Sequence, residues 1–140
     1  MSNADLVRRA LAFTNGASED PSDAELAEVF APDVVLDMST RVFNPHVYEG
    51  YDGLREFRAD ALEIWESLTI TATELVEEGD HVLVLTRVQS RGRGSGVPME
   101  VEGAGIWTLA DGRLTHYRLL APQQVDRDDA VAALQAQAGM

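Results

Sequence analysis

Cysteine is absent from this sequence, basic residues are few, and no long apolar run occurs. Without cysteine the chain has no disulfide, no thiolate nucleophile and no cysteine-ligated zinc. Lys and Arg total 11 against 24 Asp and Glu, and the formal net charge of -13 repels phosphate backbones and anionic lipid. No run approaches the ~20 apolar residues that span a bilayer, and the N-terminus lacks the basic-then-apolar order of a secretory signal. We therefore expect a cytoplasmic protein with neither nucleic acid nor a membrane as a partner.

A metal site is not indicated either. The histidines His46, His81 and His116 are too scattered for a recognisable metal motif, and we expect no metal and no cofactor. The 140 residues are the length of one domain, and they contain no repeat and no linker. We therefore treat residues 1–140 as a single domain.

The first part of the chain predicts two helices and a strand. Apolar residues at helical spacing predict a short amphipathic helix over residues 5–13. Ser22 and Glu25 form a capping-box pair, in which the hydroxyl and the carboxylate each bond a backbone N–H at the start of a second helix. β-forming residues then predict a strand over 33–39, followed by a long loop over 40–51.

One long helix is the clearest element of the sequence. Asp52 can cap its start. Apolar residues recur after it in steps of three and four, as on the buried face of an amphipathic helix. These residues are Leu54, Phe57, Ala61, Ile64, Trp65 and Leu68.

The second half of the chain is typical of a β-meander. Apolar and β-branched runs predict four strands, over residues 69–78, 81–90, 98–110 and 113–121. The Gly-Asp and Asp-Gly pairs at 79–80 and 111–112 favour tight hairpins, because such turns need positive φ. A last helix begins near Asp126 or Asp128. This order indicates an α+β fold, with helices on one face of a curved antiparallel sheet.

The stretch SRGRGSGVPME, residues 90–100, combines glycines with two arginines. A phosphate-binding P-loop would need a following helix and a Gly-Lys-Ser/Thr end. An RG-type nucleic-acid segment would need a disordered tail in a cationic chain. We therefore interpret the stretch as the bend between two strands, and we expect Arg93 to pair with surface acids.

Several short segments, in this order, resemble the NTF2-like superfamily and its SnoaL-like branch of small bacterial proteins. The matching segments are FAPDVVLDMS, YEGYDGLREF, EEGDHVLVL, RGRGSGVPMEVEGAGIWTL and DGRLTHYRLL. They span most of the chain, and they are specific for fold and family but not for a reaction. The resemblance implies a cone-shaped α+β domain with an apolar pocket between the long helices and the concave sheet face, and often a homodimer through the other face.

Ketosteroid-isomerase-like chemistry is one reaction that the superfamily implies. It needs a carboxylate base at the end of the first strand and a second, protonated carboxyl group in a later strand. By the resemblance, Met38 takes the place of the base, and Gly105 lies near the place of the second acid. Asp37 is one residue from the base position, but that step turns its side chain to the opposite face unless a bulge intervenes.

Limonene-epoxide-hydrolase-like chemistry is not supported. It needs an arginine and two aspartates around a water, with a tyrosine and an asparagine assisting. The sequence retains Arg87, but Gln89 and Leu119 replace the aspartates, and Leu36 and Met38 replace the assisting pair. An amide cannot take a proton from water, so a divergent epoxide hydrolase is the disfavoured alternative.

The resemblance then leaves an apolar pocket with few polar groups. Its expected lining is Leu36, Met38, Phe57, Ala61, Trp65, Trp107, Tyr117 and Leu119. Arg87, Gln89 and Tyr117 are the polar groups, and the arginine would hold a carboxylate, phenolate or enolate by paired hydrogen bonds. Gly105 lacks a side chain and would leave room for a planar ligand. The tryptophans of this set are also ordinary core residues.

Alternation along the strand gives Arg87 a different position. The alternate set from Val82 to Val88 is more apolar than the set from Leu83 to Gln89, which contains Arg87. Periodicity alone would therefore bury the valines and expose the arginine. Helices on one face and a dimer partner on the other would reconcile the two positions.

A catalytic base is harder to identify. Only Asp37, His46, Tyr48 or Glu102 could serve, each after a local change of register or loop position. His46 and Tyr48 lie in the loop that runs near the cavity mouth in this fold, where an exposed histidine is the ordinary state. Three functions stay open: an isomerase, cyclase or lyase acting on a hydrophobic small molecule, a non-catalytic binder of such a ligand, or a dimerisation module whose pocket is only core.

Overall fold

The computed structural model of the chain describes residues 2–15, 21–41 and 45–139. Its helices are α1 (Asn3–Asn15), α2 (Asp23–Ala27), α3 (Gly50–Ile64), the single-turn 3-10 helix η1 (Pro122–Gln124) and α4 (Arg127–Ala138). Its strands are β1 (Phe30–Met38), β2 (His46–Glu49), β3 (Trp65–Glu78), β4 (His81–Gly92), β5 (Pro98–Ala110) and β6 (Arg113–Leu119). The α+β class that the order of elements predicted is confirmed.

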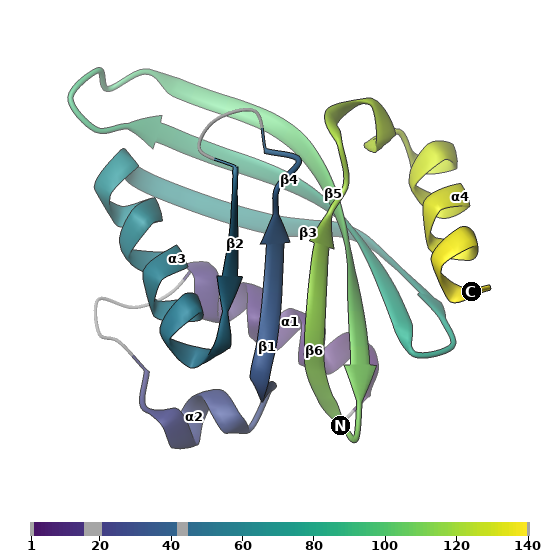
Figure 1. The fold of residues 1–140 in the computed structure, drawn as a ribbon. Coiled ribbons are helices and arrows are strands. Elements are labelled where there is room, and N and C mark those ends of the chain that lie inside the picture. The colour runs from purple at the N-terminus through teal and green to yellow at the C-terminus, as the bar shows by residue number, and fades with distance from the viewer. Residues whose placement is uncertain (1, 16–20, 42–44, 140) are drawn as a thin grey trace.

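The strands of the described residues form one bent, open sheet in the order β2-β1-β6-β5-β4-β3 (Figure 1). Strands β3 to β6 form the antiparallel meander that the sequence predicted, and Gly79 and Gly112 have positive φ in its tight turns. The sheet is mixed rather than purely antiparallel, because β1 runs parallel to β6. The long crossover through α3 and the meander makes this parallel pair possible.

Helices cover both faces of the sheet, each face over its own cluster of buried apolar side chains (Figure 1). On the inner face, Val7 of α1 and Leu54 of α3 belong to the cluster around Trp107. On the outer face, Leu134 of α4 packs in the cluster that contains Leu83. The sequence predicted all helices on one face of the sheet. Helix α4 instead packs on the outer face, opposite α1 and α3.

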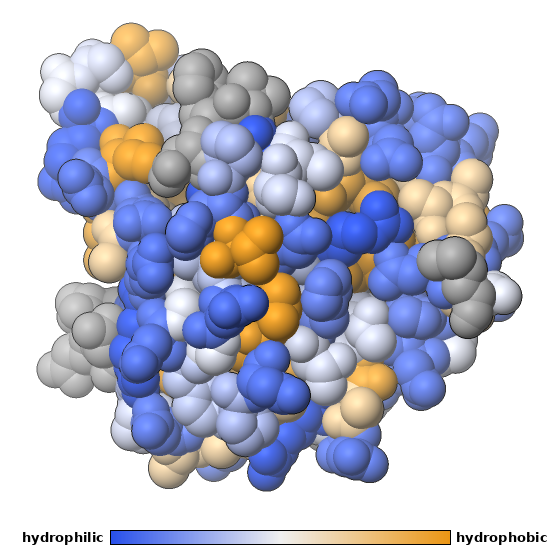
Figure 2. Space-filling model, in the orientation of Figure 1, coloured by the Kyte–Doolittle hydropathy of each residue, from blue (hydrophilic) through white to orange (hydrophobic). Residues whose placement is uncertain are grey.

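Most of the molecular face seen in Figure 2 is covered by hydrophilic residues, and hydrophobic residues show on it only in small groups. In the part of the chain that the structure describes, no helix is both long and apolar enough to cross a bilayer. Apolar side chains gather instead in the two clusters beneath the helices.

Helix starts follow the caps that the sequence indicates, with one exception. Ser22 and Glu25 form the capping box of α2, with both reciprocal bonds present. Asp126 caps α4 by accepting from the backbone N–H of Asp128. Helix α3 begins earlier than Asp52, directly after Glu49, and no side chain caps it.

Two other boundaries differ from the sequence prediction. His46–Glu49, expected in a loop, form edge strand β2, which pairs antiparallel with the end of β1. Such a short strand shows no clear period of two, and residues 42–44 of the same expected loop lie outside the described residues. Helix α3 ends at Ile64, so Trp65 and Leu68 belong to β3, where the following β-branched residues favour a strand.

The Gly-rich stretch is a hairpin between β4 and β5, as expected, and it binds the end of α3. Gly94 and Gly96 have positive φ, a conformation that glycine adopts without steric cost. Arg93 makes no ion pair with an acid of the described residues: its guanidinium donates to the carbonyl oxygen of Leu62 at 2.8 and 3.1 Å and to that of Trp65 at 3.3 Å. The last carbonyls of a helix lack intrahelical partners, so a cation stabilises this end.

Replacing Leu83 by alanine tests whether α4 packs on the outer face of the sheet. Leu83 is fully buried between the sheet and α4, so the Leu83→Ala variant should lose about 2–5 kcal/mol of unfolding free energy through the cavity it leaves. Urea unfolding measures this loss. Val101→Ala is the control, because Val101 is 51% exposed on β5. An equal loss in both variants would contradict the packing of α4 at this place.

Candidate ligand-binding pocket

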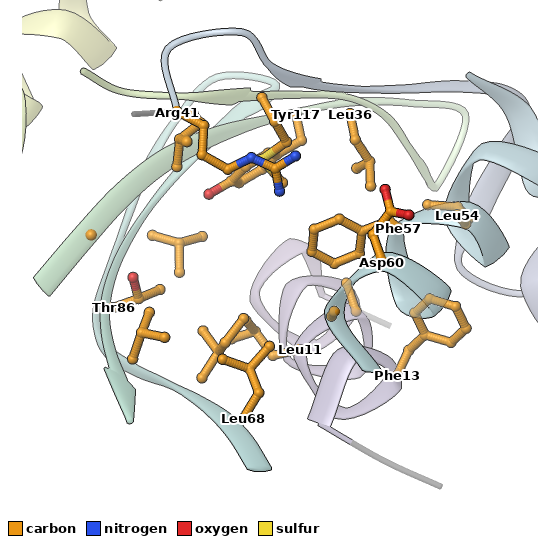
Figure 3. Close-up of a pocket in the computed structure, with 18 of the residues that line it drawn as sticks. Leu11, Phe13, Leu36, Arg41, Leu54, Phe57, Asp60, Leu68, Thr86 and Tyr117 are labelled. Carbon is orange, nitrogen blue, oxygen red and sulfur yellow. The ribbon is translucent and has the colours of Figure 1, made fainter. Parts of the chain in front are cut away.

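A pocket of about 260 Å³ lies between α1, α3 and the inner face of the sheet (Figure 3). Its wall is largely apolar, and all eight apolar and aromatic residues that the resemblance placed there line it: Leu36, Met38, Phe57, Ala61, Trp65, Trp107, Tyr117 and Leu119. Among the described residues of this lining, the charged side chains are Arg41 and Asp60, and the hydroxyl groups belong to Thr86 and Tyr117.

Arg87 lies outside this pocket, on the other face of β4. Its neighbours Thr86 and Val88 line the pocket, and successive side chains of a strand point to opposite faces. The Arg87 guanidinium instead lies 3.2 Å from the Glu100 carboxylate of β5, and 51% of the Arg87 side chain is exposed. The more apolar alternate set is thus the one that faces the pocket, and the expectation that Arg87 faces the pocket is wrong.

Gln89 and Gly105 do not line the pocket either. Gln89 has the same orientation as Arg87 and borders a separate, polar hollow. The ring and hydroxyl of Tyr117 lie where a Cβ of residue 105 would be. Gly105 therefore makes room for a side chain of the protein rather than for a ligand.

Asp37 and His46, which the sequence offered as bases, are also outside the pocket lining. Asp37 follows Leu36, which lines the pocket, and so points to the opposite face of β1. Hydrogen bonds from Ser39, including one from its backbone N–H at 3.0 Å, hold the pKa of the Asp37 carboxyl below its usual range. His46 is largely exposed, and its Nε2 lies 3.0 Å from a carboxylate oxygen of Glu56.

Tyr48 is buried behind the pocket wall and connects the two charged residues of the lining. Its hydroxyl donates to Oδ2 of Asp60 at 2.7 Å and accepts from Nη2 of Arg41 at 3.0 Å. Burial raises the pKa of Tyr48; the Arg41 hydrogen bond opposes this shift, and the Asp60 hydrogen bond adds to it. The phenol therefore stays protonated between a carboxylate from α3 and a guanidinium from the segment after β1.

Sequence reasoning missed Arg41, Asp60 and Thr86. Asp60 had a local signal, because it lies three residues after Phe57 and four before Ile64, on the apolar stripe of α3 where a carboxylate is unusual. Arg41 follows β1 in a segment that predicted only a loop, and nothing in its spacing marks it. Thr86 belongs to the apolar alternate set of β4, and this alternation predicts burial but does not mark the residue as a polar group of the pocket.

This arrangement places opposite charges on one wall of an apolar chamber. A guanidinium such as that of Arg41 can hold a carboxylate, phenolate or enolate oxygen by charge-assisted hydrogen bonds. A carboxylate such as that of Asp60 can take a proton from a bound molecule. Both interactions are stronger in an apolar pocket than in water, because the local dielectric is lower. Among the described residues, no group of His, Asp and Glu side chains could hold a metal ion.

The depressed pKa of Asp37 predicts a pH dependence of stability. A carboxyl group whose pKa is lower in the folded chain stabilises the fold above its unfolded value, near about 4, and this contribution is lost as the pH falls through the folded value. Asp37→Asn should therefore flatten the decline of unfolding free energy at acid pH, as measured by urea unfolding between about pH 2 and pH 6. Ser39→Ala should flatten it in part, and an unchanged slope in both variants would show that Ser39 does not hold this carboxylate.

Comparison with known proteins places this fold and pocket in a family. A family model described as a SnoaL-like domain matches residues 7–117. A SnoaL-like protein from Jannaschia sp. CCS1, provisionally assigned as a polyketide cyclase, aligns at a TM-score of 0.69 and 21% identity over 99% of this chain and 92% of its own. A protein from Catenulispora acidiphila DSM 44928 with a ketosteroid isomerase-like fold, crystallised with trimethylamine, aligns at a TM-score of 0.71 and 17% identity over 93% of this chain and 95% of its own. TerC, co-crystallised with polyporic acid, aligns at a TM-score of 0.65 and 18% identity over 96% of this chain and 98% of its own.

No functionally curated protein matches the chain. The identities to these solved structures are low, so the likeness concerns the fold, and it confirms the NTF2-like α+β cone that the sequence predicted. The family model extends from within α1 into β6 and so includes every described lining residue of the pocket except Leu119. The chain therefore belongs to the SnoaL-like family.

Proposed function

We propose that the chain binds a hydrophobic small molecule with a carbonyl, phenol or carboxylate in the pocket, and that it catalyses a cyclase-type step on this ligand. One observation carries the proposal: Arg41 and Asp60, joined through the Tyr48 hydroxyl, stand on the wall of an otherwise largely apolar chamber. Charges in such a wall are costly, which favours a role in holding a polar part of a ligand.

The structural comparisons support the same class of ligand. The similar protein from Jannaschia sp. CCS1 is provisionally assigned as a polyketide cyclase, and TerC was crystallised with polyporic acid. Polyporic acid combines an acidic hydroxyquinone with aromatic rings, which suits a pocket whose described lining has aromatic residues and the cationic side chain of Arg41. For this reason we take it as the first probe of the pocket.

In the step that we propose, Asp60 acts as the base. Its Oδ2 accepts from Tyr48, and its Oδ1 accepts no hydrogen bond from the described residues, so Oδ1 takes a proton from the carbon beside a ligand carbonyl. The electrons of the broken C–H bond form an enolate, whose oxygen accepts hydrogen bonds from Arg41. The enolate carbon attacks a second carbonyl carbon of the same ligand. The resulting alkoxide takes the proton back, so the cyclic product is an isomer of the substrate.

Binding without turnover is the second candidate function. Ketosteroid-isomerase-like chemistry uses two carboxyl groups, whereas Asp60 is the one acidic residue among the described residues of this pocket. A pocket with a single carboxylate suits binding as well as one proton transfer. Catalysis predicts that the wild-type protein transfers a proton from its ligand and that Asp60→Asn slows this transfer. Binding alone predicts that the wild-type protein binds its ligand without proton transfer.

Substitution of Arg41 by methionine tests ligand binding. We expect Arg41→Met to weaken binding of polyporic acid roughly tenfold or more, because a charge-assisted hydrogen bond is lost. Isothermal titration calorimetry measures the affinity. Arg87→Met is the matched control, since it removes the same charge outside the pocket. Unchanged affinity in Arg41→Met, or an equal loss in both variants, would exclude the proposed contact.

Substitution of Asp60 by asparagine separates catalysis from binding. The wild-type protein should accelerate hydrogen–deuterium exchange at the carbon beside the carbonyl of tetralone, followed by NMR, and Asp60→Asn should slow this exchange by a factor of about 10²–10⁴. Glu56→Gln is the control, because Glu56 lies on the same helix and pairs with exposed His46. If the wild-type protein binds polyporic acid but gives no exchange, the pocket binds its ligand without catalysis.

A further inference from the structure

Two glycines of β5 lie beneath hydroxyl groups on the inner face of the sheet. Gly105 lies beneath the Tyr117 ring and hydroxyl, which occupy the place of its missing Cβ. Gly103 lies opposite Thr86 in the β4–β5 ladder, and a Cβ there would lie 2.9 Å from the Thr86 Oγ1. Side chains at either position would collide with these hydroxyl-bearing groups. The glycines thus allow both hydroxyls to lie close over the strand.

The two hydroxyls are unpaired among the described residues. Neither the Tyr117 Oη nor the Thr86 Oγ1 makes a hydrogen bond there, and both side chains line the pocket. Among the described residues, every fully buried side-chain oxygen or nitrogen has a hydrogen-bond partner. The two unpaired hydroxyls are therefore not fully buried, and they open onto the pocket that their side chains line. Polar groups in an apolar site need a partner, and here the partner has to come from the pocket side.

The orientation of the Tyr117 phenol is fixed. Its ring packs against Trp107, with the centroids 4.8 Å apart and the planes inclined at 53°, and Gly105 leaves the space for its hydroxyl. Burial raises the pKa of Tyr117 far above its ordinary value, so the group is a neutral donor. A donor held in place before binding costs little conformational entropy when a ligand arrives.

The two hydroxyls lie over neighbouring positions of one strand face. Gly103 and Gly105 are two residues apart on β5, a separation of roughly 6.5–7 Å. This spacing is too wide for one shared acceptor, so each hydroxyl donates to its own ligand oxygen. In Figure 3, Thr86 lies on the sheet side of the pocket, and Asp60 lies on α3 across from it.

We propose that Tyr117 and Thr86 form a second polar position of the pocket, on the sheet wall, where each hydroxyl binds a neutral carbonyl oxygen of the ligand. This inference rests on the proposed function and narrows its ligand class. The ligand is an aromatic or fused-ring molecule with an acidic oxygen for Arg41 and ring carbonyls for the two hydroxyls. A pair of neutral donors favours a carbonyl over a carboxylate, because it offers no charge to offset the desolvation of an anion.

The test compares two anionic naphthalene probes by calorimetry. Hydroxynaphthoquinone has an acidic oxygen and ring carbonyls, whereas naphthoic acid has an acidic group and no ring carbonyl. Tyr117→Phe and Thr86→Val should each weaken hydroxynaphthoquinone binding roughly three- to tenfold, as expected for one lost hydrogen bond, and should change naphthoic acid binding less than twofold. Tyr51→Phe is the control, because Tyr51 is not part of the pocket lining and its hydroxyl already donates to the Phe30 carbonyl.

The other outcomes reject either the inference alone or the proposed function together with it. If both probes lose affinity equally in Tyr117→Phe and in Thr86→Val, the hydroxyls act through packing and the inference is wrong. It is also wrong if neither probe loses affinity in these variants while Arg41→Met weakens both; the proposed function then stands without it. If the wild-type protein binds neither these probes nor polyporic acid, the proposed function fails and takes the inference with it.

Discussion

Strand β4 lies between two layers of helices, and the two-residue period of its side chains decides which of them pack against each layer. The set from Val82 to Val88 faces the inner cluster and the pocket, whereas Leu83 faces α4. Both faces are buried at this end of the strand, so a one-residue slip would reverse both layers at once. Farther along, the outer face is open to solvent, and Arg87 meets Glu100 there. The register set at the buried end thus assigns the Thr86 hydroxyl to the pocket.

The charged part of the pocket depends in turn on a residue behind its wall. Isolated charges in an apolar wall are unstable, and the Tyr48 hydroxyl joins Arg41 to Asp60 by donating to one and accepting from the other. A phenol can do both because it stays neutral, and burial of Tyr48 raises its pKa and keeps it so. The positions of the two charged groups of the lining are therefore set by a tyrosine that lies outside the lining.

The fold and the apolar lining could be predicted because they rest on patterns that short segments carry, such as the stripe of α3 and the turns of the meander. The charged part could not. Arg41, Tyr48 and Asp60 come from three different segments and meet because β2 pairs with β1, and β2 is too short for its period to be seen. For Arg87, the family resemblance predicted a side chain that faces the pocket, whereas the alternation along the strand predicted an exposed one. The alternation was right, because packing on both faces constrains register more strongly than likeness at low identity does.

The bonds from Arg93 to the end of α3 have a consequence for local motion. Helix ends ordinarily fray, since their last carbonyls have no intrahelical partner. Here the carbonyls of Leu62 and Trp65 are bound by Arg93 of the β4–β5 hairpin, so fraying of the last turn of α3 has to break hydrogen bonds to the hairpin. Ile64 and Trp65 at this junction line the pocket. Opening of this end of the pocket wall therefore costs more free energy than fraying of a helix end without such bonds.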